Sequence, residues 1–272
     1  MAPDEAGELR VAVPGGSIPV RILTSAEPGP RAAIVYFHGG GWVHGGLDES
    51  EPVARALADH SGCLVVSVGY RLAPAYRYPT AIEDAWSAVL WVDSHLEEIA
   101  GGRLPLIVAR EDAGGNLAAV VARRAASGGP AVALQILIGP ITDADFDSLS
   151  YLDPASQSHV DRDTMISCWD QYAPDLNSRS DPDASPLQTV FLSGLPPAVI
   201  LTAEHDVLRD DGELYATRLV QAGVEVEHRR FAGQQHGFFS RPDPAQSASR
   251  DGLDYVAAAV ARRLAQPKAP RR

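Results

Sequence analysis

Short apolar runs typical of buried strands alternate with longer helical patterns along most of this chain. The apolar runs are Ala32–Phe37, Leu64–Val68, Leu104–Ala109, Val132–Ile138 and Ala198–Ala203. The helical patterns are Glu51–His60, Ile82–Ile99, Asn116–Ala126, Asp211–Ala222 and Ala248–Ala265. Strands that alternate with helices in this way form a mostly parallel sheet with helices on both faces. The sequence therefore predicts an α/β fold.

The two ends of the chain depart from this alternation. Leu9–Val13 and Ile18–Leu23 flank a Pro-Gly-Gly turn and predict an antiparallel hairpin. Val224–Phe231 predicts a later strand with more alternating polarity. A length of 272 residues suits one large domain, so we expect a single domain over residues 1–272. Residues 266–272 are rich in proline and basic side chains, which predicts a disordered tail.

Residues 143–187 interrupt the alternation with a segment rich in aspartate, serine and proline. Its aromatic side chains are Phe146, Tyr151, Trp169 and Tyr172. The segment is longer than an ordinary loop and should lie over the carboxyl edge of the sheet, where open α/β sheets bind ligands. We predict a partly helical insertion that serves as a lid. The alternative is a surface excursion that only packs against the sheet.

Composition excludes several classes of function. The formal net charge is −12, from 23 basic and 35 acidic residues, and such a chain repels the phosphate backbone of nucleic acids. No apolar run reaches the roughly 18 residues of a membrane span. The polar, acidic N-terminus predicts no secretory signal, so we expect a cytoplasmic protein. We interpret His44, His60, His95, His159 and His228 as surface or packing residues and expect no metal and no cofactor, because their spacings match no metal site.

A glycine-rich segment, His38-Gly39-Gly40-Gly41-Trp42, directly follows the strand at Ala32–Phe37. Successive glycines let backbone N–H groups converge on one point, as an oxyanion hole requires. A turn that needs glycine only for its shape is the alternative. Four further motifs follow in order: Tyr70-Arg71-Leu72-Ala73-Pro74, Ala113-Gly114-Gly115-Asn116-Leu117-Ala118, Asp206-Val207-Leu208-Arg209-Asp210 and His236-Gly237-Phe238.

In this order the motifs resemble the hormone-sensitive-lipase branch of the α/β-hydrolase fold, over about residues 21–265. The resemblance implies a mostly parallel central sheet with helices on both faces. It also implies that Gly39, Gly40 and Ala113 supply the backbone N–H groups of an oxyanion hole.

The resemblance further implies that His236 is the general base and that Asp206 orients it. The nucleophile position departs from the family pattern, which is G-D-S-A-G-G. This sequence has Asp112 in place of the serine, Arg110 in place of the first glycine and Glu111 between them. An aspartate at this position allows three functions.

In the first, Asp112 is a nucleophile toward a small organic or natural-product substrate of ester, lactone or epoxide type. Attack on an sp³ carbon gives an alkyl ester of the enzyme, which water activated by His236 hydrolyses. This resembles the α/β hydrolases that open epoxides or displace halide. Epoxide opening also needs an acid near the leaving oxygen. Tyr151 and Tyr172 are candidates, and packing of the lid is the alternative role for both.

In the second, Asp112 and His236 form a proton-transfer pair beneath the oxyanion hole. The enzyme is then an epimerase, isomerase, cyclase or lyase of a biosynthetic pathway. In the third, the chain is a catalytically silent ligand-binding protein. The presence of His236, Asp206 and the glycine motif argues against the third.

The expected partner is a small-molecule or peptide-like substrate. The resembled family carries a helical N-terminal cap, whereas residues 1–31 here have the pattern of strands, which favours a more open pocket. Trp42, Arg110 and Glu111 are further candidate substrate-binding residues, although Arg110 alternatively forms a structural ion pair with its acidic neighbours. The resemblance also implies a possible homodimer through the strand Val224–Phe231.

Overall fold

The computed structural model describes residues 8–25, 29–240 and 247–266. The strands are β1 (Leu9–Val13), β2 (Gly16–Leu23), β3 (Ala33–Phe37), β4 (Leu64–Val68), β5 (Leu106–Glu111), β6 (Val132–Pro140), β7 (Ala198–His205) and β8 (Val226–Gln235). They form one sheet in the order β1-β2-β4-β3-β5-β6-β7-β8. The β1–β2 and β2–β4 pairings are antiparallel and the remaining pairings are parallel. The predicted N-terminal hairpin is therefore confirmed at one edge of the sheet.

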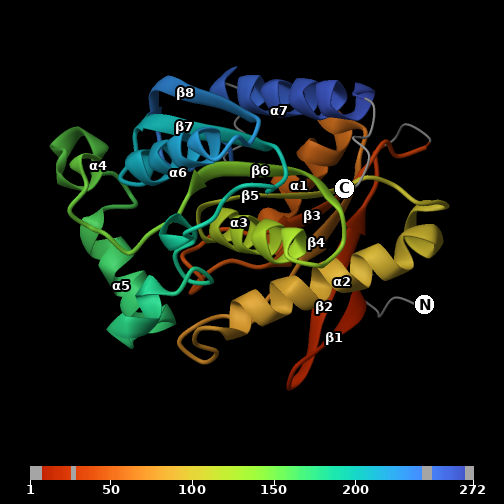
Figure 1. Ribbon diagram of the computed structural model, residues 1–272, viewed down its shortest axis with the longest axis horizontal. Coiled ribbons are helices and arrows are strands. Elements are labelled where there is room, and N and C mark those ends of the chain that lie inside the picture. The colour runs from red at the N-terminus through yellow and green to blue at the C-terminus, as the bar shows by residue number, and fades with distance from the viewer. Residues whose placement is uncertain (1–7, 26–28, 241–246, 267–272) are drawn as a thin grey trace.

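Helices cover both faces of this sheet (Figure 1). The helices α1 (Leu47–Ser61) and α7 (Ser247–Ala265) lie on one face, and α2 (Thr80–Ala100), α3 (Asp112–Ala126) and α6 (Arg209–Gln221) lie on the other. Every residue of β3, β4 and β5 is buried, as expected for parallel strands between two helical layers. The predicted α/β fold with a mostly parallel sheet is confirmed.

The start of helix α3 differs from its prediction, and this difference sets the position of the candidate site. The sequence pattern predicted a helix from Asn116, but α3 begins at Asp112, directly after the last residue of β5. The two glycines of the Ala-Gly-Gly motif precede that predicted start. They lie instead inside the first turn of the helix, where the chain packs too closely on its neighbours for side chains.

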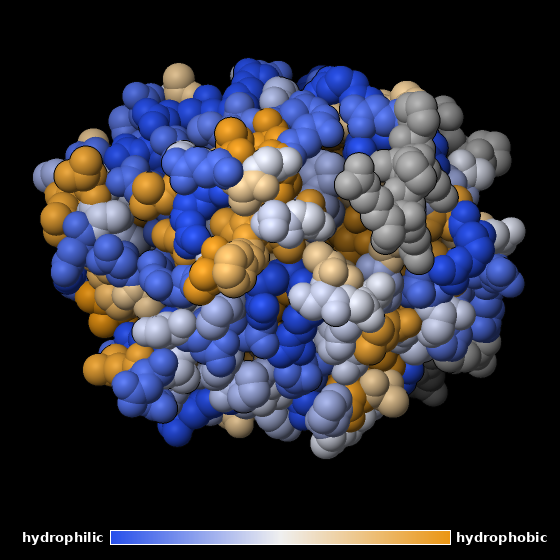
Figure 2. All heavy atoms as spheres, viewed as in Figure 1, coloured by the Kyte–Doolittle hydropathy of each residue, from blue (hydrophilic) through white to orange (hydrophobic). Residues whose placement is uncertain are grey.

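The insertion at residues 143–187 is partly helical, as predicted. Its elements are α4 (Leu149–Leu152), η1 (Pro154–Ser156), α5 (Arg162–Tyr172), η2 (Leu176–Ser180) and η3 (Pro186–Gln188). At its start, the buried Asp211 carboxylate accepts hydrogen bonds from the backbone N–H groups of Thr142 and Asp143 at 2.8 and 3.1 Å. Figure 2 shows apolar residues on the outer surface at this end of the molecule, and Leu149 is 78% exposed. Its role as a lid stays a prediction.

None of the described helices is long and apolar enough to cross a membrane. The expected single domain stays a prediction. Of the predicted tail, residues 267–272 lie outside the described part of the chain.

Candidate active site

The turn from β5 into α3 places Asp112 at the carboxyl edge of the sheet. Asp112 has φ 58°, a left-handed conformation that non-glycine residues rarely adopt. The turn is tight, because a Cβ at Gly114 would overlap the carbonyl oxygens of Phe37 and His38. Such strain persists only where the surrounding structure enforces it, and it is common at functional sites. Asp112 therefore occupies a sharp elbow that presents its carboxylate above the sheet.

The glycine loop after β3 holds that carboxylate. The Oδ2 atom of Asp112 accepts hydrogen bonds from the N–H groups of Gly40 at 2.6 Å and Gly41 at 2.9 Å. Both glycines have positive φ, 109° and 58°, so the turn requires glycine there. Gly39 lies beside the same oxygen, with its own Cβ position 3.3 Å from it. The N–H groups of the glycine loop do converge on one point, where Gly40 and Gly41 donate to Asp112, and the oxyanion-hole role of Gly39, Gly40 and Ala113 stays a prediction.

His236 and Asp206 meet beside this elbow. The Nδ1 atom of His236 lies 2.9 Å from Oδ2 of Asp206, and both residues are at least 95% buried. The other carboxylate oxygen of Asp206 accepts the Leu208 N–H at 2.9 Å, which fixes the side chain. Gly139, with φ 45°, passes close to both side chains, because its Cβ position is 3.1 Å from Oδ2 of Asp206.

The carboxylates around His236 hold it in the protonated state at neutral pH. Burial by itself lowers the pKa of His236, but the charge and hydrogen bond of Asp206, together with the charges of Asp112 and Glu111, outweigh burial and raise the pKa to about 10. In this arrangement His236 is a proton donor. Removal of one of the surrounding negative charges would lower the pKa of His236.

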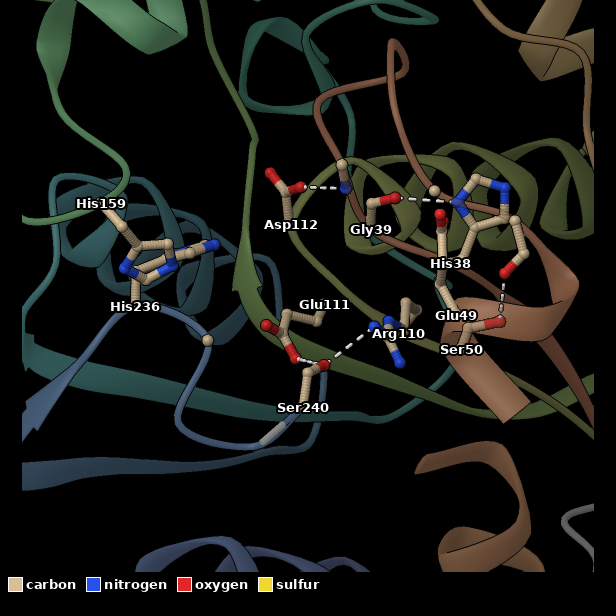
Figure 3. A pocket seen from close by; sticks show the side chains of 14 residues that line it. His38, Gly39, Glu49, Ser50, Arg110, Glu111, Asp112, His159, His236 and Ser240 are labelled. Carbon is tan, nitrogen blue, oxygen red and sulfur yellow. Dashed lines mark hydrogen bonds between the residues drawn. The ribbon is translucent and has the colours of Figure 1, made fainter. Parts of the chain in front are cut away.

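Arg110 and Glu111, which precede Asp112, are linked through a residue far along the chain. Ser240 accepts a hydrogen bond from Nη2 of Arg110 at 2.8 Å and donates one to Oε2 of Glu111. The guanidinium also lies 4.7 Å from the centroid of the Tyr36 ring. The expected ion pair is thus bridged by a hydroxyl group, because Ser240 lies between the two charges (Figure 3).

One cavity of about 230 Å³ lies at the elbow, and its wall includes Arg110, Glu111, Asp112, His236 and Ser240. Its wall also includes His38, Glu49, Ser50 and His159, and Figure 3 shows His159 beside His236. The ring centroids of these two histidines are 5.9 Å apart. A cavity of this size favours a small molecule over a peptide-like substrate.

Three of the predicted substrate-binding residues do not line this cavity. Trp42 stacks on Tyr172 with ring centroids 4.2 Å apart, and Trp169 meets Trp42 edge-on. Tyr151 is 1% exposed, and Trp42 and Tyr172 are fully buried. The contacts of Trp42 with Trp169 and Tyr172 join the glycine loop to the insertion, since aromatic pairs bury large areas, whereas the Tyr151 ring contacts Phe146 of the insertion itself. Their burial supports the packing alternative for both tyrosines, and a substrate-binding role for these three residues stays a prediction.

Sequence reasoning missed His159 and Ser240. His159 was interpreted as a surface or packing residue, and it is exposed, but it lies on the cavity wall between η1 and α5. Ser240 follows the His-Gly-Phe motif, and no sequence pattern marked it as a functional residue. The position of His159 within the predicted lid was the one available signal. Within the described ranges, no group of three or more His, Cys, Asp or Glu side chains is arranged to hold a metal ion.

The fold and the site together define a class of protein. A strained elbow at the end of a central strand, N–H donors from a neighbouring loop and a buried acid–histidine pair on one mostly parallel sheet are the parts of an α/β hydrolase. The chain belongs to the alpha/beta hydrolase fold family, whose pattern matches residues 34–240.

Within that family the chain is similar to several esterases. Carboxylesterase NlhH of Mycobacterium tuberculosis is 44% identical over 212 residues, which cover 75% of this chain and 66% of NlhH, so the match spans just under two thirds of that relative. An ethyl acetate hydrolase of Pseudomonas putida is 35% identical over 92% of this chain and 80% of its own. The solved structure of EstE1, a thermostable carboxylesterase from a metagenomic library, superposes with a TM-score of 0.88 at 38% identity, covering 96% of this chain and 89% of EstE1. These likenesses support an enzyme of the α/β-hydrolase class.

His236 should make the stability of the fold depend on pH. Its pKa rises from 6.5 to about 10 on folding, so its contribution to stability is complete below pH 6.5 and is lost as the pH rises through about 10. We expect the melting temperature of the wild type to fall more steeply between neutral pH and about pH 10 than that of His236→Gln. Parallel melting curves for the two proteins over this range would contradict the expectation.

Proposed function

We propose that this chain is an enzyme that uses Asp112 as a nucleophile on an sp³ carbon of a small epoxide-type substrate and then hydrolyses the resulting enzyme ester. One observation carries the proposal: Oδ2 of Asp112 already occupies the N–H groups of Gly40 and Gly41. The carboxylate is held by one oxygen, which leaves Oδ1 as the attacking atom. The same donors then face the oxygen that becomes an oxyanion when water attacks the ester.

The hydrogen bonds of Asp112 favour nucleophilic attack by Asp112 over the other reactions that the sequence allows. Direct hydrolysis of a carboxylic ester or lactone would place the substrate carbonyl oxygen on these donors, where Asp112 now sits. Epimerisation, isomerisation or elimination through an enolate would require the same place. Both reactions need Asp112 to leave its hydrogen bonds. Attack by Asp112 needs no such movement.

The first half-reaction forms the ester. Oδ1 of Asp112 donates an electron pair to the epoxide carbon, the carbon–oxygen bond of the ring breaks, and the leaving oxygen takes a proton from an acid of the enzyme. The negative charge of Asp112 disappears in this step. Because that charge helps to keep the pKa of His236 high, esterification lowers this pKa, and His236 gives its proton to the acid that has just lost its own.

The second half-reaction restores the carboxylate. Neutral His236 takes a proton from water as the oxygen of that water attacks Cγ of Asp112. The developing charge on Oδ2 is stabilised by Gly40 and Gly41. The intermediate collapses, the product oxygen takes the proton from His236, and the acid formed on Asp112 returns its own proton to His236. The sum is one water added to one epoxide.

The proposal is tested with a variant that carries out the first half-reaction but not the second. In His236→Gln the ester should form but not be hydrolysed, so intact mass spectrometry after incubation with a styrene-type epoxide should show a gain equal to the epoxide mass. Peptide mapping should place it on Asp112. The double variant Asp112→Asn/His236→Gln is the matched control and should gain nothing.

A second readout uses the wild type. A single turnover in ¹⁸O-labelled water should place ¹⁸O in the Asp112 carboxylate. Turnover without label, or a His236→Gln protein that never gains mass, would contradict a covalent route. An inert protein that nevertheless binds such compounds would favour the ligand-binding function, in which Asp112 closes the donor site permanently.

A further inference from the structure

The proposed reaction needs an acid at the leaving oxygen, and the tyrosines of the insertion do not supply it. Tyr151 and Tyr172 are buried in the packing beneath the insertion, and neither lines the cavity at Asp112. Burial raises the pKa of both hydroxyl groups well above 10. A proton donor must instead come from a side chain on the cavity wall.

The geometry points to His159 of the insertion as the acid that protonates the leaving oxygen, an inference that rests on the proposed function. His159 lies between η1 and α5 and lines the same cavity as Asp112 and His236 (Figure 3). It is exposed, so it exchanges protons with solvent, whereas His236 is only 5% exposed. Histidine is also the side chain that changes charge between about pH 5 and 8.

The surroundings of His159 suit a cationic ring. A Cβ on Gly237 would lie 3.4 Å from Nε2 of His159 and 3.7 Å from Oε1 of Glu111, so the ring and the carboxylate approach one point. The ionisable groups that share this cavity come from six segments: His38 after β3, Glu49 of α1, Arg110 and Glu111 of β5, Asp112 of α3, His159 of the insertion and His236 after β8. Ser240 lies between Arg110 and Glu111 and binds Oε2 of Glu111. The other carboxylate oxygen, Oε1, faces the side of the cavity where His159 lies.

The two histidines then divide the proton transfers. His159 gives its proton to the leaving oxygen in the first half-reaction and becomes neutral. Removal of the Asp112 charge lets His236 pass its proton to His159 through one water molecule, since the ring centroids are 5.9 Å apart. His159 is thereby recharged, and neutral His236 is ready to activate water. No proton is gained or lost overall.

The test measures the first half-reaction alone, in the His236→Gln background where the ester accumulates. The rate of mass gain with a styrene-type epoxide should fall at least about 10²-fold in His159→Gln/His236→Gln, the usual contribution of a general acid. In the single variant the rate should fall as pH rises through the histidine range, and this dependence should vanish in the double variant. His60→Gln/His236→Gln is the matched control, because His60 is an exposed histidine on α1, and its rate should equal that of the single variant.

A second variant separates chemistry from a disturbed insertion. In His159→Gly/His236→Gln, added imidazole buffer should restore the rate of mass gain in proportion to the imidazolium concentration. An unchanged rate and pH dependence in His159→Gln/His236→Gln would overturn the role of His159 while leaving the covalent route intact. A slowed rate that imidazole does not restore would also overturn it. If His236→Gln itself never gains mass, the proposed function and this inference fail together.

Discussion

Asp112→Asn is expected to lower kcat/KM for epoxide hydrolysis by at least about 10⁴-fold, the scale on which removal of a nucleophile acts. The amide oxygen of asparagine still accepts from Gly40 and Gly41, so the glycine loop keeps its shape. What is lost is the charge and the attacking electron pair of Oδ1. The change therefore tests nucleophilic attack rather than folding.

Two comparisons make this result interpretable. Asp112→Ala should be equally inactive, which guards against slow conversion of the asparagine back to aspartate. Asp251→Asn, a change of the same kind at an exposed position on α7, should keep full activity. Steady-state kinetics with a styrene-type epoxide and circular dichroism spectra would be recorded for all three. A residual rate above a tenth of the wild type in both Asp112 variants would show that Asp112 is not the nucleophile.

Asp112→Ser is expected to gain activity, with a rate of carboxylic ester hydrolysis about 10²-fold above that of the wild type. This factor is the lower end of the rate effect of one oxyanion-hole donor. The shorter side chain vacates the N–H groups of Gly40 and Gly41 and leaves a hydroxyl beside His236. Removing the Asp112 charge also lowers the pKa of His236 toward the range of a base. The relatives of this chain include carboxylesterases, so the scaffold suits that reaction.

The control for this gain is Asp112→Ala, which also vacates the donors but supplies no nucleophile. Release of nitrophenol from a short-chain nitrophenyl ester would be followed for both variants across pH. Because Asp206, and to a smaller extent Glu111, still raise the pKa of His236, activity of Asp112→Ser should increase toward alkaline pH. Equal rates in the two variants would mean that the freed donors do not serve an ester carbonyl.

The sheet was predictable from the sequence because its signals are local. β3 and β4 are short apolar runs buried at every residue, and the hairpin of β1 and β2 follows from alternating residues around two glycines. The elbow was harder to delimit. Its strained residue and the glycines after it have the composition of a loop, and only the close approach of Phe37 and His38 places them in a helix.

The candidate site was predictable as a set of residues, but the direction of each side chain was not. Motif order brought Asp112, Asp206 and His236 to one edge of the sheet. Which glycine N–H groups reach Asp112 depends on how the loop turns. Whether Trp42 faces the cavity or packs in the interior depends on which ring it stacks against. Such choices are made by contacts between segments distant in sequence, and so were the cavity positions of His159 and Ser240.

The link from Arg110 through Ser240 to Glu111 bears on how a site like this changes over evolutionary time. Arg110 and Glu111 are about 95% buried, and two guanidinium nitrogens of Arg110 have no hydrogen-bond partner within the described chain. Replacing either residue alone strands the opposite charge in the interior, which typically costs about 3 kcal/mol or more. Replacing Arg110 alone by glycine, the residue of the family pattern, therefore destabilises the fold, because it leaves the Glu111 carboxylate buried without its bridged partner. Arg110 and Glu111 are in that sense coupled positions: a substitution at one of them is tolerated only when the other changes with it.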